Sequence, residues 1–317
     1  MASGGLRLIE QMRLDGLHHV TMITGDARKN VRFYADLLGL RLVKRTVNFD
    51  QPDAYHLYFG DEAGAPGSIL TWFEFPGAAP GRAGAGMIHL LELAVGSEDA
   101  LEFWERRLAA GGCAARREGS SLRFEDHDGL AFALVLAEEN EPLRAEHPEI
   151  PREHAIAGVA AARAHTPAAV AGADAPLLSE TLGFAAGGLG EYLLDGARRS
   201  FRWSYDPAPA QVGRQGAGTV HHIAWACPDE EQLAWRERVR AAGRHVTDVL
   251  DRDYFRSIYF REPRGVLFEI ATRSPGFAVD EDSEHLGEQL RLPARYESRR
   301  SSLEALLTPI ENPRAER

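Results

Sequence analysis

Strand-forming stretches and amphipathic stretches follow one another in the same order near both ends of the chain. Residues 16–22 contain the β-branched pattern of a strand, and residues 30–38 have the apolar spacing of a helix that ends at Gly39. Residues 218–224 and 231–242 repeat this order, and a glycine follows again. This self-similarity predicts two copies of one structural unit.

Two weaker copies lie between these ends. Residues 86–90 precede a predicted helix over 99–110, and residues 157–159 precede a predicted helix that ends before Gly183. In the first and last copies the helix is followed by predicted strands at 41–47, 54–59 and 68–75, and at 245–250, 258–261 and 265–272. Four βαβββ modules, and therefore an α+β fold, are predicted.

Linkers rich in proline, glycine or charge separate the modules. We therefore expect one unit at residues 14–140, with modules one and two, and a second at residues 152–274, with modules three and four. Residues 275–317 form a C-terminal tail that is acidic and then rich in arginine. This composition fits either a cap that packs on the fold or a solvated arm.

Composition and charge narrow the class of protein. Of the 317 residues, 44% are hydrophobic and 26% are charged, which is enough for a sizeable core. Asp and Glu outnumber Lys and Arg by 47 to 36, and the resulting net charge of −11 disfavours binding to nucleic acid or to an anionic membrane. Residues 1–14 lack the apolar segment of a secretory signal and no apolar run is long enough to span a membrane, so we expect a cytoplasmic protein.

Four of the twelve histidines form two adjacent pairs at equivalent strand positions, His18-His19 and His221-His222. Alternation along a strand sends the two members of each pair to opposite faces. In module two, His89 aligns with His221, and Leu90 therefore stands in the column of His222. If module two lacks a metal site, the ligand column is that of His19 and His222.

A carboxylate, Glu269, interrupts the apolar run of the last predicted strand. Burying it unpaired would cost several kcal/mol, so it should be paired, metal-bound or exposed. Thr71 and Ala133 occupy the equivalent positions in modules one and two. Together with His19 and His222, Glu269 makes a 2-His-1-carboxylate set, which leaves open coordination positions and suits non-haem Fe(II). The middle modules, with His89, should then be structural copies without chemistry.

The modules with a leading histidine and a trailing glutamate resemble the vicinal oxygen chelate superfamily, which includes glyoxalase I, bleomycin-resistance proteins and extradiol dioxygenases. More narrowly, residues 14–295 resemble the hydroquinone-type ring-cleaving dioxygenases. The segments that carry this resemblance are 17–21, 42–48, 55–61, 64–67, 251–259 and 276–282. The resemblance implies the vicinal oxygen chelate fold, in which the four modules form two pseudo-barrels.

The resemblance also implies a metal and its surroundings. The metal would be Fe(II), with Mn(II) as a substitute, on His19, His222 and Glu269. The residues around it would be catalytic His221, Arg252 and Tyr259, and substrate-binding His18 and Thr21. Each has an ordinary alternative: strand alternation points His18 and His221 away from the ligand face unless a bulge redirects them, and Arg252 could pair with Asp251 or Asp253.

We therefore predict an Fe(II)-dependent ring-cleaving dioxygenase that inserts both atoms of O2 into a hydroquinone-type or related diphenol ring. Its partners would be the small aromatic diphenol and O2, with neither nucleic acid nor a membrane, and assembly into a homo-oligomer is left open. One alternative is a glyoxalase-type Zn or Ni isomerase or lyase, which needs a second carboxylate; Glu74, off by register, is the candidate in module one. The other is a non-catalytic binding protein of the bleomycin-resistance type, which needs no metal ligands.

Overall fold

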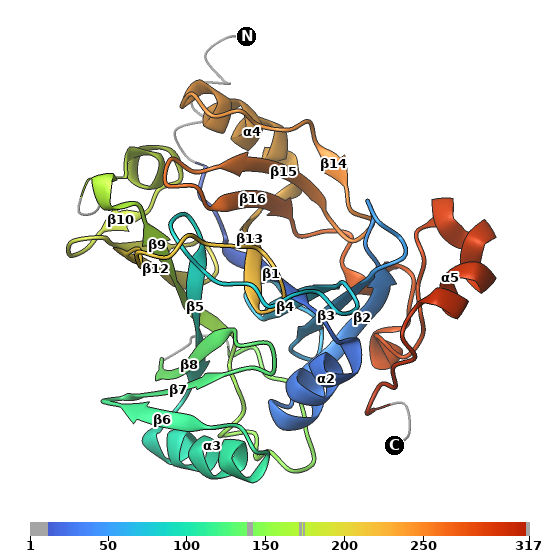
Figure 1. The fold of residues 1–317 in the computed structure, drawn as a ribbon. Coiled ribbons are helices and arrows are strands. Elements are labelled where there is room, and N and C mark those ends of the chain that lie inside the picture. The colour runs from blue at the N-terminus through green and yellow to red at the C-terminus, as the bar shows by residue number, and fades with distance from the viewer. Residues whose placement is uncertain (1–11, 138–141, 171–172, 174, 315–317) are drawn as a thin grey trace.

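The computed structural model describes residues 12–137, 142–170, 173 and 175–314, and its strands form two eight-stranded sheets (Figure 1). The first sheet joins modules one and four in the order β14-β15-β16-β13-β1-β4-β3-β2. The second joins modules two and three in the order β10-β11-β12-β9-β5-β8-β7-β6. The predicted α+β fold of βαβββ modules is confirmed.

The strands of the first sheet are β1 Gly16–Thr24, β2 Arg41–Val47, β3 Tyr55–Gly60, β4 Ile69–Glu74, β13 Thr219–Cys227, β14 Leu250–Asp251, β15 Arg256–Arg261 and β16 Leu267–Thr272. Those of the second are β5 Ile88–Val95, β6 Ala115–Glu118, β7 Ser121–Glu125, β8 Ala131–Leu136, β9 Val159–Thr166, β10 Ala185–Ala186, β11 Glu191–Asp195 and β12 Ser200–Pro207. The longer helical segments are α2 Ala27–Val31, which continues as a π-helical turn at Arg32–Leu37, α3 Glu98–Ala110, α4 Gln232–Ala241 and α5 Arg300–Leu306.

Two predicted elements differ from the structure. In module three the described residues form short helical turns at Ala168–Val170 and Leu177–Thr181 instead of one helix. Pro167 directly precedes the first turn and Pro176 the second, and proline interrupts a helix interior. The strand predicted at 245–250 is reduced to β14, because it lies at the sheet edge and pairs only briefly with β15.

The first sheet pairs modules from opposite ends of the chain, and the second pairs the two consecutive middle modules. The division into units at residues 14–140 and 152–274 stays a prediction, and residues 138–140 lie outside the described residues. Each sheet draws its strands from both sides of this division. Module one therefore shares its sheet with module four, which brings the two ends of the chain together.

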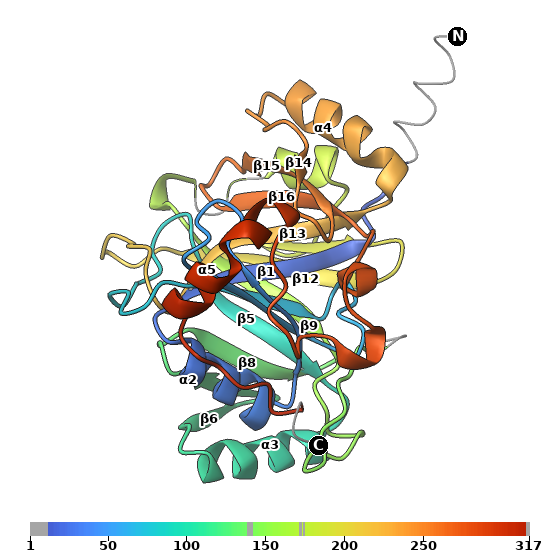
Figure 2. The same cartoon turned by 90° about the vertical axis from the view of Figure 1, so that its right-hand side faces the viewer.

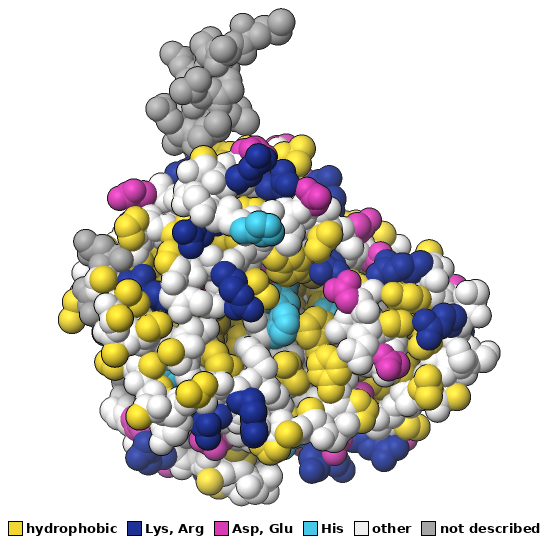
Figure 3. Space-filling view, turned by 45° about the horizontal axis from the view of Figure 1, so that its top comes forward, with side chains coloured by type: hydrophobic (Ala, Val, Ile, Leu, Met, Phe, Trp, Pro, Cys, Tyr) yellow, Lys and Arg dark blue, Asp and Glu magenta, His cyan; other side chains and the backbone are white. Residues whose placement is uncertain are grey.

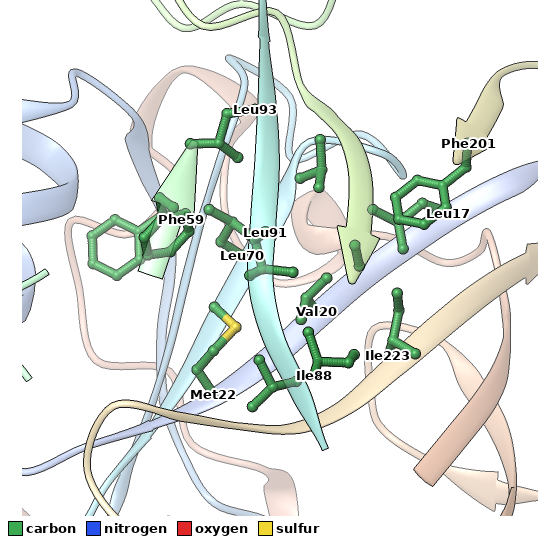
Figure 4. Packing of buried hydrophobic residues seen from close by; sticks show 14 of the residues in the cluster. Leu17, Val20, Met22, Phe59, Leu70, Ile88, Leu91, Leu93, Phe201 and Ile223 are labelled. Carbon is green, nitrogen blue, oxygen red and sulfur yellow. The ribbon is translucent and has the colours of Figure 1, made fainter. Parts of the chain in front are cut away.

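The main core lies between the sheets, where β5 crosses β1 (Figure 4). Val20 and Met22 of β1 pack there with Ile88 and Leu91 of β5, and all four are almost fully buried. Because side chains alternate along a strand, the residue before Val20, His19, faces the other side of the first sheet. Packing of the core side of β1 thus fixes which side chains can form a site.

The C-terminal tail caps the edge strand β2 and passes α2 (Figure 2). Leu290 forms a β-bridge with Arg45, and the Arg45 guanidinium donates through Nη1 to the carbonyl oxygen of Ile310 at 2.9 Å. Leu303 and Leu307 belong to the main core. Of the two interpretations of the tail, the cap is confirmed for the part that the structure describes, and it covers a sheet edge that would otherwise offer unpaired backbone groups.

The linkers that lead from module one to two and from module three to four cross each other in close contact. Arg82 and Arg214 exchange two backbone hydrogen bonds of 2.8 Å at the crossing. A Cβ atom added at Gly84 would collide with the backbone nitrogen and Cα of Gly213. Glycine is required at this crossing because two backbones approach where a side chain would stand.

We predict that Gly84→Ala lowers the free energy of unfolding by about 1–3 kcal/mol, because the linkers must separate to admit a methyl group. Gly96→Ala is the matched control, since the nearest atoms to an added Cβ there are at 3.6 Å or more. Urea unfolding of both variants measures the difference. Equal stability of the two variants would contradict this account of the crossing.

Candidate metal centre

The three candidate ligands come from neighbouring strands in the middle of the first sheet. β1 pairs antiparallel with β13, with His19 opposite Ala224 and Thr21 opposite His222. β13 pairs in parallel with β16, which sets Glu269 beside Ala224. The ligand set predicted from the sequence requires the first and last modules to pack together, and they do, although 203 residues separate the two histidines.

The ligand atoms of His19, His222 and Glu269 converge on one point. The two Nε2 atoms are 3.2 Å apart, and Oε2 of Glu269 lies 3.4 Å from Nε2 of His19 and 3.0 Å from Nε2 of His222. All three side chains are buried. Among the described residues, no second group of histidine, cysteine or carboxylate side chains gathers in this way.

The Glu269 carboxylate is held from one side and left open on the other. Its Oε1 accepts a hydrogen bond from the Ser257 hydroxyl, whereas the buried Oε2 accepts none that is well aligned. Burial opposes ionisation, but His19 and His222 outweigh it and hold the pKa of this carboxyl well below its usual range. A buried carboxylate oxygen that faces two imidazole nitrogens without a hydrogen bond fits a divalent cation.

A β-bulge stands at the first histidine of each pair. Between Leu17 and His19 the register of β1 shifts by one residue, which leaves His18 without a partner in β13. A second shift leaves His221 as the extra residue of β13. Strand alternation alone would point both away from the ligands, and the bulges bring each one back against its neighbour.

The contacts of the histidine pairs fix their tautomers if Nε2 of each ligand faces a metal. Nδ1 of His19 lies 2.9 Å from Nδ1 of His18, and Nδ1 of His222 lies 2.8 Å from Nδ1 of His221. A ligand that presents a lone pair at Nε2 carries its hydrogen at Nδ1, so it donates to the outer histidine. The outer histidine then carries its own hydrogen at Nε2.

The two outer histidines use that Nε2–H differently. Nε2 of His18 donates to the carbonyl oxygen of Thr272 at 3.1 Å, and His18 is 2% exposed. Nε2 of His221 has no hydrogen-bond partner among the described residues, and His221 lines the cavity beside the ligands. Partial enclosure by the protein and the neighbouring His222 lower the pKa of His221 to about 4, while part of the side chain stays exposed.

A cavity of about 520 Å³ opens in front of the ligands. Its apolar walls are formed by Phe49, Phe73, Phe75, Leu250, Phe255 and Leu267. Figure 3 shows a hollow near the middle of this face of the molecule, with histidine side chains (cyan) inside it. A cavity with aromatic walls and a few polar groups is suited to a small aromatic ligand.

Arg252 and Tyr259, two of the residues predicted to be catalytic, lie together on the cavity wall. Nε of Arg252 donates to the Tyr259 hydroxyl at 3.2 Å, and the guanidinium lies 5.3 Å from the centre of the Tyr259 ring. Nη1 of Arg252 pairs with Asp50 at 3.2 Å, so the alternative pairing with Asp251 or Asp253 is not formed. Burial and the nearby Glu269 charge raise the pKa of Tyr259, which keeps its hydroxyl protonated.

The predicted substrate-binding residues do not line the cavity. His18 lies behind His19, which it contacts, and Thr21 is completely buried with no hydrogen bond to its hydroxyl. His18 is therefore placed to hold His19, and neither residue lines the cavity. Their assignment to substrate binding stays a prediction that this geometry does not favour.

His56 of β3 is a cavity residue that the sequence interpretation missed. Its Nδ1 accepts a hydrogen bond from the Tyr58 hydroxyl at 2.8 Å, and its Nε2 bonds to the Thr71 hydroxyl. Burial lowers the pKa of His56 well below its usual range. Tyr58 faces Thr71 across the strands as Tyr259 faces Glu269. The repeat therefore carries a signal for Tyr58, which stands in β3 where Tyr259 stands in β15, whereas His56 corresponds to Ser257 and has no such signal.

The middle modules lack the ligand set. β5 and β8 place Glu92 beside Ala133, so the position equivalent to Glu269 carries a methyl group. Nε2 of His89 instead lies 2.8 Å from the Asp206 carboxylate, and its ring stacks on His165 at 3.9 Å. A separate cavity of about 660 Å³ between the first and second modules lies away from the paired histidines.

Glu74, the second carboxylate that a glyoxalase-type ligand set would need, is engaged elsewhere. Its Oε1 accepts hydrogen bonds from the Ala27 amide at 3.2 Å and from the Thr308 hydroxyl at 3.1 Å. Neither it nor another acidic side chain joins His19, His222 and Glu269 among the described residues. The cluster therefore has three protein ligands and leaves room for exogenous ones.

Comparison with known proteins finds the same architecture elsewhere. A family model described as "Glyoxalase/Bleomycin resistance protein/Dioxygenase superfamily" matches residues 16–134 and 147–270. The chain is 42% identical over 304 residues to "Putative ring-cleaving dioxygenase MhqO" of Bacillus subtilis, covering 93% of this chain and 96% of that protein. It is 31% identical to "Chlorohydroquinone/hydroquinone 1,2-dioxygenase" of Sphingobium indicum, covering 92% and 95%.

A solved structure has a similar fold. The crystal structure of a "putative dioxygenase" from Bacillus subtilis superposes with a TM-score of 0.85 at 40% identity, covering 95% of this chain and 98% of the other. In the described part of the chain, none of the helices is both long enough and apolar enough to cross a membrane.

We predict that His19→Ala and Glu269→Ala each lose most of the iron that the wild-type chain retains at about one ion per chain, because each removes one of three ligands. Glu74→Gln is the control, since Glu74 is a buried carboxylate of the same sheet away from the cluster. Metal analysis after anaerobic loading with Fe(II) measures the content. Full retention by both alanine variants would refute the assignment.

His89→Gln should leave iron content and turnover close to wild type while changing the pH dependence of stability. Burial and His165 lower the pKa of His89 to about 4, whereas an unfolded histidine titrates near 6.5. The unfolded state therefore binds more protons between these values, and wild-type stability falls as the pH drops through them. The variant should lose about 1–2 kcal/mol less between pH 7 and 4.5. Urea unfolding at both pH values tests this, and identical losses would contradict it.

Proposed function

Because the chain belongs to the glyoxalase/bleomycin resistance protein/dioxygenase superfamily, we propose that it is a ring-cleaving dioxygenase that uses Fe(II) and acts on a hydroquinone-type diphenol. The enzyme would insert both atoms of O2 into the ring. The observation that carries this proposal is the buried set of His19, His222 and Glu269 at the head of an aromatic-walled cavity.

The donor set fits a ferrous ion. Two imidazoles and one carboxylate on one side leave adjacent coordination positions open, as non-haem Fe(II) oxygenases require. When bound, Fe(II) supplies the redox chemistry that allows O2 to react with an electron-rich aromatic ring, and Mn(II) has the same ligand preferences. Ser257 would hold Oε1 of Glu269 so that Oε2 faces the metal.

His221 would exchange or share a proton with the bound substrate at Nε2. This atom is the ring nitrogen that faces the cavity, because Nδ1 is occupied by His222. With Nδ1 as acceptor, Nε2 carries hydrogen and can donate to an oxygen of the diphenol. The low pKa of His221 keeps the ring neutral, so it supplies a hydrogen bond without adding a positive charge near the metal.

Arg252 and Tyr259 would hold the far end of a hydroquinone. A catechol chelates a metal through two adjacent oxygens, whereas a hydroquinone can offer only one, and its second hydroxyl must be bound by protein. The Tyr259 hydroxyl accepts from Arg252 and therefore keeps its own hydrogen for a ligand. These donors are suited to stabilise negative charge that develops on the substrate.

Neither alternative function has an observation in its favour. A glyoxalase-type isomerase would need a fourth protein ligand, and Glu74 is bound to Ala27 and Thr308. A simple binding protein would have no use for a buried carboxylate between two histidines, which is costly unless a cation compensates it. The metal-dependent oxygenase accounts for both features.

We predict that the iron-loaded protein turns over methylhydroquinone with a higher kcat/KM than methylcatechol. Arg252→Ala or Tyr259→Phe should remove about 1–3 kcal/mol of transition-state binding for the hydroquinone, because a donor to the remote hydroxyl is lost. Oxygen uptake with each substrate measures this. A clear preference for the catechol would move the protein to the extradiol class and leave only the metal assignment standing.

A further inference from the structure

Arg252 is the one lysine or arginine among the described residues that line the cavity. Its side chain is 17% exposed, and Nε and the guanidinium face are engaged by Tyr259. Nη2 makes no hydrogen bond to a described residue. In isolation such a cation would be an attractive site for the carboxylate of an acid-substituted ring.

Asp50, from module one, forms an ion pair with Arg252. It lies in the loop between β2 and β3, and its two carboxylate oxygens are 3.2 and 3.4 Å from Nη1 of Arg252. The Asp50 side chain is 78% exposed, and among the described residues no other charged group lies within ion-pair distance of it. An ion pair this exposed adds little to stability, so the fold does not require a carboxylate here.

The pair makes the substrate end of the cavity electrically neutral. A ligand carboxylate would have to sit beside the Asp50 carboxylate or displace it from Arg252, and like charges in proximity are penalised. A neutral substituent meets no such penalty and can still accept from Nη2.

We propose that Asp50 is a specificity-determining residue that excludes carboxylate-bearing diphenols by neutralising Arg252. The site then selects neutral diphenols with apolar or uncharged polar substituents, for which the phenylalanine walls provide the contacts. This is selection by repulsion of the wrong ligand as well as by attraction of the right one. The inference rests on the proposed function, because it takes the cavity as the diphenol site.

The test uses two ligands that differ in little but charge, 2,5-dihydroxyphenylacetamide and 2,5-dihydroxyphenylacetate. Calorimetry under anaerobic conditions measures their binding to the Fe(II)-loaded protein without turnover. The wild-type chain should bind the amide about tenfold or more tightly than the acid. Asp50→Asn should bind the acid about tenfold more tightly than wild type does and leave the affinity for the amide within about twofold.

Two further variants control the result. Asp53→Asn removes the same charge from an exposed residue of the same loop that does not line the cavity, and it should behave as wild type. Asp50→Glu retains the charge and should keep the acid excluded. If both ligands bind and Asp50→Asn leaves their ratio unchanged, the inference is overturned while the proposed function stands. If neither ligand binds to any variant, the diphenol site and the inference built on it both fall.

Discussion

The antiparallel pairing of β1 with β13 is the interaction on which the candidate site depends. One strand comes from each end of the chain, and their contact brings His19 within 3.2 Å of His222. Neither module carries two histidines in the ligand column, so the centre forms only when the chain has closed on itself. Modules one and four share one sheet, and modules two and three share the other. This pairing of modules is therefore required for the function as well as for the topology.

The bulges in β1 and β13 are alike, but the outer histidines that they position, His18 and His221, have different contacts. Each strand has a bulge at its outer histidine, but His18 is tied to the Thr272 carbonyl while Nε2 of His221 faces the cavity. The repeat thus supplies two ligands of one kind and two supporting histidines that differ. This difference gives the centre a closed side and an open side, and only the open side continues into the aromatic cavity.

The ligand columns could be predicted from sequence because repeated strands keep their register, and the positions of Thr71 and Ala133 opposite β1 and β5 agree with the alignment. The bulges could not, because β1 and β13 are buried almost throughout and carry no alternation of polarity in which an extra residue would show as a shift. The Arg252–Asp50 pair joins loops from opposite ends of the chain and has no local signal. The C-terminal cap likewise depends on burial of Leu303 in the core, which the charged composition of the tail does not indicate.

The proposed function requires one ferrous ion at this centre to couple O2 to cleavage of a diphenol ring. Oxygen uptake by metal-free protein titrated with Fe(II) in the presence of a hydroquinone, with mass analysis of the product, tests it most directly. We expect activity to rise until about one iron per chain is bound, one O2 to be consumed per diphenol, and the product to have the mass of the diphenol plus O2. Release of hydrogen peroxide with formation of the quinone, or full activity without metal, would contradict it.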